Sequence, residues 1–416
     1  MALIGTVPRR CVNLPPGSLR TLLSTITSGT VLKGAAVDEF YHRFGTWVGA
    51  PYVFGTGSGR SAFQLALEAL GLPKGAEIIF PVLTFPVIPL VAKILGYQPV
   101  FCDVDPVTFN SGPEHIEPKI TDRTGAILAT HLFGQPCPIK QIVELARQHD
   151  IRVMEDCAHA CGVRIDGQPA GTFGDIGVFS FAEGKNMPCF GGGAIVTADE
   201  NIATRAQAVL ADTELPDMKQ TVQHAASIWL MWLLTRPLVF GLTVYPALRL
   251  KLLLGQPLMD SKVGNDLLDE FASRRPEIRR FTNLQAAIGL LQLEHVDTFN
   301  DGARNNAQAL TDQLGQVDGI GVPSCEGSDH IYVYYPLTID PDKRDALRHH
   351  LLKYGIDSKN TDMANCTRLK LFQTAQSQNQ PEPMTEASLL EVCVYPVIPR
   401  KRMGEIARAI REFAKA

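Results

Sequence analysis

The stretch of sequence that decides the fold runs from residue 153 to residue 197. It begins Val153-Met154-Glu155-Asp156-Cys157-Ala158-His159-Ala160 and continues as Gly174-Asp175-Ile176-Gly177-Val178-Phe179-Ser180-Phe181-Ala182-Glu183-Gly184-Lys185-Asn186, followed by Gly191-Gly192-Gly193 and the apolar run 194–197. An aspartate therefore ends one apolar run, and a lysine shortly follows another. Several unlike residues at set distances make this pattern specific.

These residues suit the chemistry of pyridoxal phosphate. A carboxylate can keep a pyridine nitrogen protonated, a serine can hold a phosphate, and a lysine can form a Schiff base with an aldehyde. We assign these three roles to Asp156, Ser180 and Lys185. The ordinary alternatives are a helix N-cap for Asp156 and a solvated surface amine for Lys185. His159 lies about one helical turn after Asp156, so it would face the same way, with a packing histidine as its alternative.

A second motif, Gly57-Ser58-Gly59-Arg60-Ser61, precedes the helical pattern of 62–70. The N–H groups at a helix N-terminus bind phosphate, and glycine allows a close approach. We therefore predict a phosphate cup at Gly59, Arg60 and Ser61. The Arg60 guanidinium would clamp the cofactor phosphate or an acidic substrate group; otherwise it is an outward surface arginine.

The whole pattern resembles the DegT/DnrJ/EryC1/StrS family of sugar aminotransferases, which have the aspartate aminotransferase-like fold of type I. The residues that carry the resemblance outside 153–197 are Ser28-Gly29, Gly34, Glu39-Phe40, Gly57 to Ala62, Phe80-Pro81, Thr84-Phe85, Phe101 to Asp105, His131 to Pro136, Leu284 to Gly289 and the run 389–399. The resemblance implies pyridoxal 5'-phosphate as cofactor, a homodimer, and glutamate as amino donor. It further implies that Phe85 stacks on the pyridine ring and that His159 lies near the ring hydroxyl.

The sequence departs from the family in four places. Arg60 replaces a threonine of the phosphate cup. The family's Gly-x-Asn-x-Arg element, whose asparagine reaches the phosphate across the dimer, aligns with Pro276, Ile278 and Arg280, so only the arginine is kept. The late His-Tyr substrate element is replaced by residues 355–362, and residues 205–275 do not look like the family.

Composition agrees with a soluble enzyme that binds small molecules. The chain has 416 residues, 45% hydrophobic and 20% charged, with a formal charge of −4. This balance gives no pull towards nucleic acid. The 9 cysteines are scattered without paired CxxC blocks, so we expect reduced core thiols in a cytoplasmic protein and no metal site. The first residues lack the apolar core of a secretory signal.

The alternation of apolar runs and helical patterns predicts an α/β fold with a mostly parallel sheet. The runs lie at 64–70, 78–80, 87–95, 100–104, 126–129, 139–147 and 153–155. We expect a large cofactor-binding domain over 1–300, with an N-terminal helix and an atypical apolar insert at about 205–275. A smaller α/β domain would cover 301–416, with strand-like runs at 329–339 and 392–397 before helices at 343–354 and 402–413.

Residues 225–248 form an apolar segment with one charge, Arg236, next to Pro237. A single helix of this length would be about 36 Å long, enough to span a bilayer, but a central arginine and a proline argue against a span. Two short apolar pieces forming a hairpin in the plane of the interface fit better, with Trp229 and Trp232 suited to that position. Two interpretations stay open: a buried or dimer-covering insert, and peripheral membrane contact through 225–256 at the inner face of the membrane.

Together these features predict a homodimeric transaminase that converts a keto group on a sugar or sugar-like substrate, possibly nucleotide-linked, to an amine. Lys185 would carry the proton transfers through two ping-pong half-reactions. A lysine at position 185 also argues against the family's dehydratase branch, whose members have histidine at that position. Two alternatives remain: a pyridoxal phosphate enzyme acting on a lipid-linked or apolar carbonyl at the membrane, and a non-catalytic, membrane-docked binding or regulatory homologue. The acceptor, the aminated carbon and the stereochemistry are left open.

Overall fold

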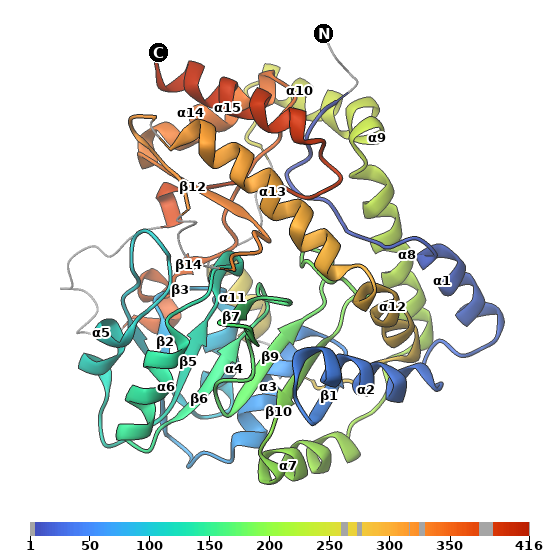
Figure 1. The fold of residues 1–416 in the computed structure, drawn as a ribbon, viewed down its shortest axis with the longest axis vertical. Helices are drawn as coiled ribbons and strands as arrows, with labels where there is room; N and C mark the ends of the chain where they lie inside the picture. The colour runs from blue at the N-terminus through green and yellow to red at the C-terminus, as the bar shows by residue number, and fades with distance from the viewer. Residues whose placement is uncertain are drawn as a thin grey trace.

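The computed structural model describes residues 5–258, 265–272, 277–315, 317–323, 329–373 and 386–415. Its centre is a sheet of 7 strands in the order β1-β10-β9-β6-β5-β2-β4 (Figure 1). Every neighbouring pair from β9 to β4 is parallel, whereas β10 is antiparallel to both β9 and β1. The strands are β1 (Tyr52–Thr56), β2 (Glu77–Pro81), β4 (Gln98–Cys102), β5 (Thr124–Thr130), β6 (Arg152–Asp156), β9 (Ile176–Ser180) and β10 (Gly193–Thr197).

Helices cover both faces of this sheet. Side chains alternate along each strand, so Ile78 and Phe80 pack with α3 and α4 while Ile79 packs with α6 on the other face. The strands therefore read as nearly continuous apolar runs, which is why the sequence predicts a parallel sheet. The surrounding helices are α1 (Ser18–Thr27), α2 (Ala36–Val48), α3 (Gly59–Leu70), α4 (Val87–Ile94), α6 (Ile139–Gln148), α7 (Glu200–Ala211) and α12 (Asn283–Leu293).

The C-terminal part forms a second, smaller sheet in the order β11-β12-β15-β13 with three helices against it. Its elements are β11 (Ile320–Gly321), β12 (Tyr335–Ile339), β13 (Lys359–Asn360), β15 (Leu389–Val392), α13 (Val296–Leu314), α14 (Pro341–Lys353) and α15 (Arg400–Ala414). Short elements complete the chain: β3 (Leu83–Thr84), α5 (Pro113–Ile116), η1 (Glu117–Lys119), η2 (Leu132–Gly134), β7 (Arg164–Ile165), β8 (Gln168–Pro169), β14 (Ala364–Asn365), η3 (Cys366–Arg368), η4 (Lys370–Phe372) and η6 (Glu386–Ser388).

The strand expected at 392–397 is misplaced, because β15 ends at Val392. The following apolar residues are buried in a turn instead of a ladder. Pro396 and Pro399 have no N–H to give to a sheet. The Nδ2 of Asn306 satisfies the turn by donating to the carbonyls of Val394, Tyr395 and Ile398 at 2.9–3.2 Å.

The N-terminal segment packs against the small sheet, not the large one. Val7 donates to the Gly355 carbonyl and accepts from the Asp357 N–H, both at 2.8 Å. Arg9 holds the Asp357 carboxylate with two nitrogens, at 2.7 and 2.9 Å. The chain ends marked in Figure 1 accordingly lie at the same end of the molecule.

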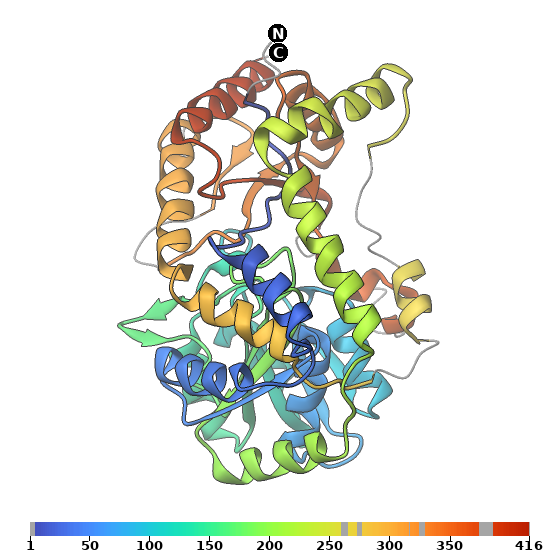
Figure 2. The ribbon, with the colours of Figure 1, turned by 90° about the vertical axis from the view of Figure 1, so that its right-hand side faces the viewer.

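The atypical insert folds into helices α8 (Met218–Leu234), α9 (Pro237–Leu242), α10 (Val244–Leu253) and α11 (Asn265–Ala272). In Figure 2, α8 runs along the length of the molecule and α9 and α10 follow beside the small domain. The chain thus has a long α8 where the sequence suggested one arm of a short hairpin. Among the described helices, none combines the length and apolarity needed to cross a bilayer.

Arg236 shows how the break between α8 and α9 is stabilised. Its Nη2 donates to the Val12 carbonyl at 2.6 Å, and its guanidinium lies 4.7 Å from the centre of a Trp232 ring. Pro237 begins α9, where a missing N–H costs nothing. Ala225 and Ile228 bury one face of α8 against α1 and α12. Part of the insert is therefore an internal packing element.

Candidate active site

The predicted site residues converge in one pocket of about 500 Å³ at the carboxyl ends of the parallel strands. This is where ligands bind in open α/β sheets. The pocket lining includes Gly59, Arg60, Phe85, Asp156, His159, Ser180 and Lys185. Ser61 is the exception: it does not line the pocket, because its hydroxyl lies 2.9 Å from the Ser58 hydroxyl and donates to the Glu277 carbonyl.

Lys185 lies in the turn between β9 and β10. Its N–H donates to the Ala182 carbonyl, and the Tyr334 and Tyr395 hydroxyls both donate to the Gly184 carbonyl at 3.0 and 3.1 Å. Burial lowers the pKa of the Lys185 amine to about 8, although the Asp156 and Asp362 carboxylates oppose that shift. A rigid turn therefore carries an amine that is partly neutral near physiological pH.

Asp156 ends β6 and faces the same space. Its Oδ1 accepts the Ala158 N–H at 2.9 Å, so the capping role and the pocket position coexist in one carboxylate. Burial raises the pKa of Asp156, while the charge of Lys185 lowers it. Thr130, the register partner of Asp156 on β5, places a buried hydroxyl in the same wall, and no described group hydrogen-bonds to that hydroxyl. The pocket floor is consequently polar and suited to a cationic ring nitrogen.

His159 is held as a neutral ring. Its Nδ1 accepts the Phe133 N–H at 3.2 Å, which leaves the proton on Nε2. Burial lowers the pKa of His159 well below its ordinary value, and the charges of Lys185 and Lys359 act in the same direction. Phe133 stacks on the ring with centroids 6.1 Å apart. His159 is thus a packed histidine, and it also lines the pocket, so its predicted role beside the cofactor stays a prediction.

The phosphate cup is built at the start of α3. Ser58 caps the helix by accepting the Ser61 N–H. A Cβ on Gly59 would lie 2.6 Å from the Ser180 Oγ, and a Cβ on Gly193 would lie 2.7 Å from the Gly59 Cα. Only glycine fits at these two positions, so no side chain of residue 59 or 193 covers the start of α3, where Ser58 caps the Ser61 N–H.

The atypical insert reaches this pocket. The Arg60 guanidinium lies 4.4 Å from the centre of the Phe271 ring on α11, and Leu267 of the same helix and His224 of α8 also line the cavity. Arg60 therefore lies against a wall of the pocket. Sequence reasoning did not assign these three insert residues to the site, because nothing in their local pattern indicates which surface α11 covers.

Residues 355–362, which replace the family's His-Tyr element, place a buried ionic cluster beside Lys185. Lys359 Nζ lies 2.6 Å from the Asp362 Oδ2, 3.0 Å from the Glu391 Oε2 and 4.4 Å from the centre of the Tyr334 ring. Asp362 and Tyr334 line the pocket. Two carboxylates thus share one buried ammonium. The sequence showed that this segment differs from the family but not what it does.

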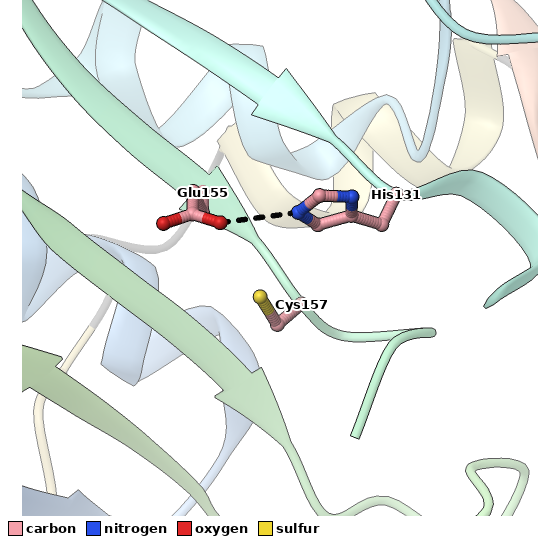
Figure 3. A group of neighbouring side chains, drawn as sticks. All are labelled: His131, Glu155 and Cys157. Atoms are coloured by element: carbon pink, nitrogen blue, oxygen red, sulfur yellow. Dashed lines mark hydrogen bonds and ion pairs between the residues drawn. The ribbon is translucent and has the colours of Figure 1, made fainter. Parts of the chain in front are cut away.

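Behind Asp156, a group of three side chains, His131, Glu155 and Cys157, has ligand atoms within 4.8 Å of one another (Figure 3). His131 and Glu155 are both engaged in hydrogen bonds. His131 Nδ1 accepts the Cys137 N–H, and its Nε2 lies 3.2 Å from Glu155. Glu155 also accepts three backbone N–H groups at 2.7–2.8 Å. We interpret the group as a network that fixes the end of β6.

The element aligned with the family's phosphate asparagine has another use in this chain. Ile278 packs into the core beneath α3, and the Arg280 guanidinium donates to the carbonyls of Leu210 and Ala211. Pro276 lies outside the described residues. Neither Ile278 nor Arg280 reaches the pocket lining.

Comparisons with known proteins agree with this site. The UDP-N-acetyl-3-dehydro-alpha-D-glucosamine 3-aminotransferase of Acidithiobacillus ferrooxidans is 31% identical over 361 residues, which are 86% of this chain and 83% of that protein. Among solved structures, S. venezuelae DesV superposes with a TM-score of 0.71 at 25% identity, covering 96% of this chain and 94% of that one. The NtdA structure from Bacillus subtilis, which holds PMP, has a TM-score of 0.72 at 21% identity over 97% and 83% of the two chains.

The predicted fold class is confirmed by these superpositions and by the mostly parallel sheet. The model of the DegT/DnrJ/EryC1/StrS aminotransferase family matches residues 17–227 and 277–413. The interruption, 228–276, covers most of the segment that the sequence marked as atypical, whereas residues 205–227 of that segment do match the family. Because the match spans well over half of the residues on both sides of the insert, this chain belongs to the DegT/DnrJ/EryC1/StrS aminotransferase family.

Proposed function

We propose that the protein uses pyridoxal 5'-phosphate to convert the keto group of a nucleotide-linked sugar to an amine, with glutamate as donor. The observation that carries the proposal is the convergence of Lys185, Asp156 and His159 in one pocket beside the glycine cup of α3. The activity for which the A. ferrooxidans relative is named supports a nucleotide sugar as acceptor. The comparisons favour this reading over a lipid-linked substrate or a non-catalytic homologue.

The residues present fit this cofactor. The cup at Gly59 excludes a Cβ and offers N–H groups at a helix N-terminus, which suits a phosphate. Ser180 adds a hydroxyl within the same wall, and Asp156 offers a buried carboxylate to a ring cation. When bound, pyridoxal phosphate supplies an aldehyde carbon that carries the amino group and a ring that accepts electrons.

Lys185 has two tasks in the reaction. Its neutral amine would hold the cofactor aldehyde, and as a free amine it would take a proton from the donor Cα. The same amine returns a proton to the sugar carbon in the second half-reaction. Over both halves, the donor loses its amino group to become a 2-oxo acid, and the ketone oxygen is replaced by that amino group.

Asp156 and His159 set the electronic state of the site. The Asp156 carboxylate stabilises a protonated ring nitrogen, which a neutral side chain could not do. The N–H at His159 Nε2 would be free to donate to an oxygen of the cofactor, because Nδ1 already accepts the Phe133 N–H. Phe85, which lines the pocket, would cover one face of the ring.

Two further parts of the proposal rest on the family. We propose a homodimer, and we propose that its phosphate cup does not use an asparagine from the second copy, since Ile278 stands at the aligned position and packs into the core of its own chain. Arg60 supplies a guanidinium at the pocket wall for the phosphate of the cofactor or an acidic group of the acceptor.

The test combines trapping with turnover. Borohydride reduction of the protein loaded with pyridoxal phosphate should add the cofactor's mass to the peptide that contains Lys185. Lys185→Ala should lose this adduct and all transamination from glutamate to a panel of nucleotide keto sugars, with unchanged circular dichroism. Lys140→Ala is the matched control, because that lysine forms only an exposed pair with Asp166. Turnover by Lys185→Ala above a no-enzyme blank would overturn the proposal.

A further inference from the structure

We propose that helices α9 and α10 dock the protein onto an anionic lipid surface. The docking element is a group of five leucines, which we call the leucine patch: Leu238, Leu242, Leu250, Leu253 and Leu254. Their exposed fractions are 55%, 59%, 57%, 75% and 63%. They make up nearly half of the exposed large apolar residues found in the described chain, although they lie within 17 sequence positions.

The patch is the exposed side of two short, mostly apolar helices. Leu238 and Leu242 are four residues apart on α9, and Leu250, Leu253 and Leu254 have the i, i+3, i+4 spacing of one face of α10 and its C-terminal end. The opposite faces are buried, because Phe240 and Leu248 pack together with Leu352 of α14. The helices are therefore anchored on the small domain while their leucines point away from it.

The charges around the patch match an anionic surface. Residues 218–259 contain no aspartate or glutamate, and the basic side chains of α10 itself are Arg249 and Lys251, both half-buried. A second basic group lies at the same end of the molecule, at the start of α15. There Arg402 pairs with Glu405 and lies beside Gly5, and the neighbouring Thr6 donates to the Pro237 carbonyl at 2.8 Å.

The start of α15 is basic and accessible. Arg400 and Lys401 are both exposed, and Figure 1 shows α9, α10, α14 and α15 gathered at one end of the molecule. Apolar area gives the binding energy of an interfacial helix, and nearby basic residues add attraction to anionic headgroups. The structure combines both features at this end.

A second copy of the chain fits this surface less well than a lipid headgroup layer does. In a twofold interface both copies contribute the same surface, so Arg249 and Lys251 would meet a second set of basic side chains and no acidic residue from 218–259. Such like charges repel in a desolvated contact. Headgroup phosphates instead complement them. The match to the family is also interrupted from 228 to 276, so this surface is an addition to the part of the chain that is shared with relatives.

The test is co-sedimentation of the full chain with vesicles at low salt. Vesicles of phosphatidylglycerol mixed with phosphatidylcholine should bind the protein, and vesicles of phosphatidylcholine alone should bind it at least about tenfold less. The triple variant Leu250→Ser, Leu253→Ser, Leu254→Ser should lose at least about tenfold in binding, because exposed side chains supply the inserted area. Its transamination of a soluble acceptor should be unchanged.

Two matched variants complete the experiment. Leu19→Ser with Leu23→Ser removes exposed leucines of α1, which lie outside the patch, and should bind vesicles normally. Arg400→Glu with Lys401→Glu should weaken binding only to the anionic vesicles. The proposal is overturned if the intact protein stays in the supernatant, if the triple leucine variant binds as well as the parent, or if that variant changes only the oligomeric state.

Discussion

Lys185 is the residue on which the chemistry depends, and its surroundings tune it. The side chain lies between the carboxylate of Asp156 and the cluster of Lys359 and Asp362, and burial outweighs the two carboxylates to keep the pKa of its amine at about 8. A lysine with an ordinary pKa near 10.4 would be almost fully protonated at neutral pH. The neutral fraction needed to capture an aldehyde therefore comes from the position of this residue in the fold.

The first prediction follows from that pKa. Because the folded value is lowered, the neutral amine accumulates as the pH rises through about 8, so covalent uptake of pyridoxal phosphate by the cofactor-free protein should accelerate between pH 7 and 9. Stopped-flow absorbance at a series of pH values would measure it. Asp156→Asn should move the midpoint to lower pH, since this carboxylate raises the pKa of Lys185. A midpoint near 10 would contradict the assignment.

A second prediction concerns Asp156 as the partner of the ring nitrogen. Asp156→Asn keeps the hydrogen bond to Ala158 but removes the charge, so the variant should bind cofactor and lose at least about 100-fold in turnover. Single-turnover kinetics with glutamate would separate binding from rate. Thr130→Val removes the neighbouring hydroxyl and leaves the carboxylate, so it should reduce turnover much less than Asp156→Asn does. An undiminished rate in Asp156→Asn would assign the task to another group.

Among individual residues, the sequence predicted which side chains come together only where their positions in the sheet follow from their spacing along the chain. Asp156, Ser180 and Lys185 end or follow consecutive strands of one sheet, so their convergence follows from topology. Asp362 and Phe271 come from distant segments with no motif, and their positions depend on tertiary packing. Ser61 shows the limit within a motif: its hydroxyl turns to Ser58 and the Glu277 carbonyl, away from the pocket.

The N-terminus of α3 illustrates how an element is shaped for its ligand. Ser58 satisfies one N–H, and the next residues leave theirs open because glycine at 59 keeps the space clear. Among the elements, the sequence-based prediction failed for the strand expected at 392–397. Residues 392–397 are apolar enough for a strand, but Pro396 and Pro399 favour a buried turn that Asn306 satisfies. Apolarity predicts burial there but not conformation.

A third prediction tests the cup. Gly59→Ala places a Cβ 2.6 Å from the Ser180 Oγ, so the strand and helix must separate and cofactor affinity should fall at least about tenfold. Fluorescence titration of the cofactor-free protein would measure the loss. The control is Gly404→Ala within α15, where the nearest atom would be 3.7 Å away. That variant should keep its affinity and gain up to about 1 kcal/mol of stability.

At the scale of the whole molecule, the two sheets are joined by segments that cross between them. The N-terminal segment contacts the small sheet through Val7 and Arg9, α13 leads from one part to the other, and α8 runs alongside both (Figure 2). The expected boundary near residue 300 thus falls inside α13 (Val296–Leu314). Local sequence patterns could not show that the N-terminal segment contacts the small sheet, because Val7 and its partners are far apart along the chain.

The fourth prediction measures that connection. Arg9→Ala leaves the Asp357 carboxylate, whose side chain is only 3% exposed, without its bidentate partner. Loss of one member of a buried ion pair should cost about 3 kcal/mol in the free energy of unfolding. Thermal and denaturant melts would record it. Lys140→Ala breaks an exposed pair and should cost less than about 1 kcal/mol. Equal losses of unfolding free energy in both variants would show that the Arg9–Asp357 pair stabilises the fold no more than an exposed ion pair does.

The bond between Arg9 and Asp357 joins residues 348 positions apart. At a translation rate of about 5–20 residues per second, Arg9 is synthesised roughly 20–70 seconds before Asp357. The large sheet can form in that interval, whereas the N-terminal segment cannot yet bind the small sheet. A nascent chain that stops short of residue 357 never forms this ion pair. Until residue 357 is made, the N-terminal segment lacks this partner, and unpaired chain ends are preferred sites of proteolysis.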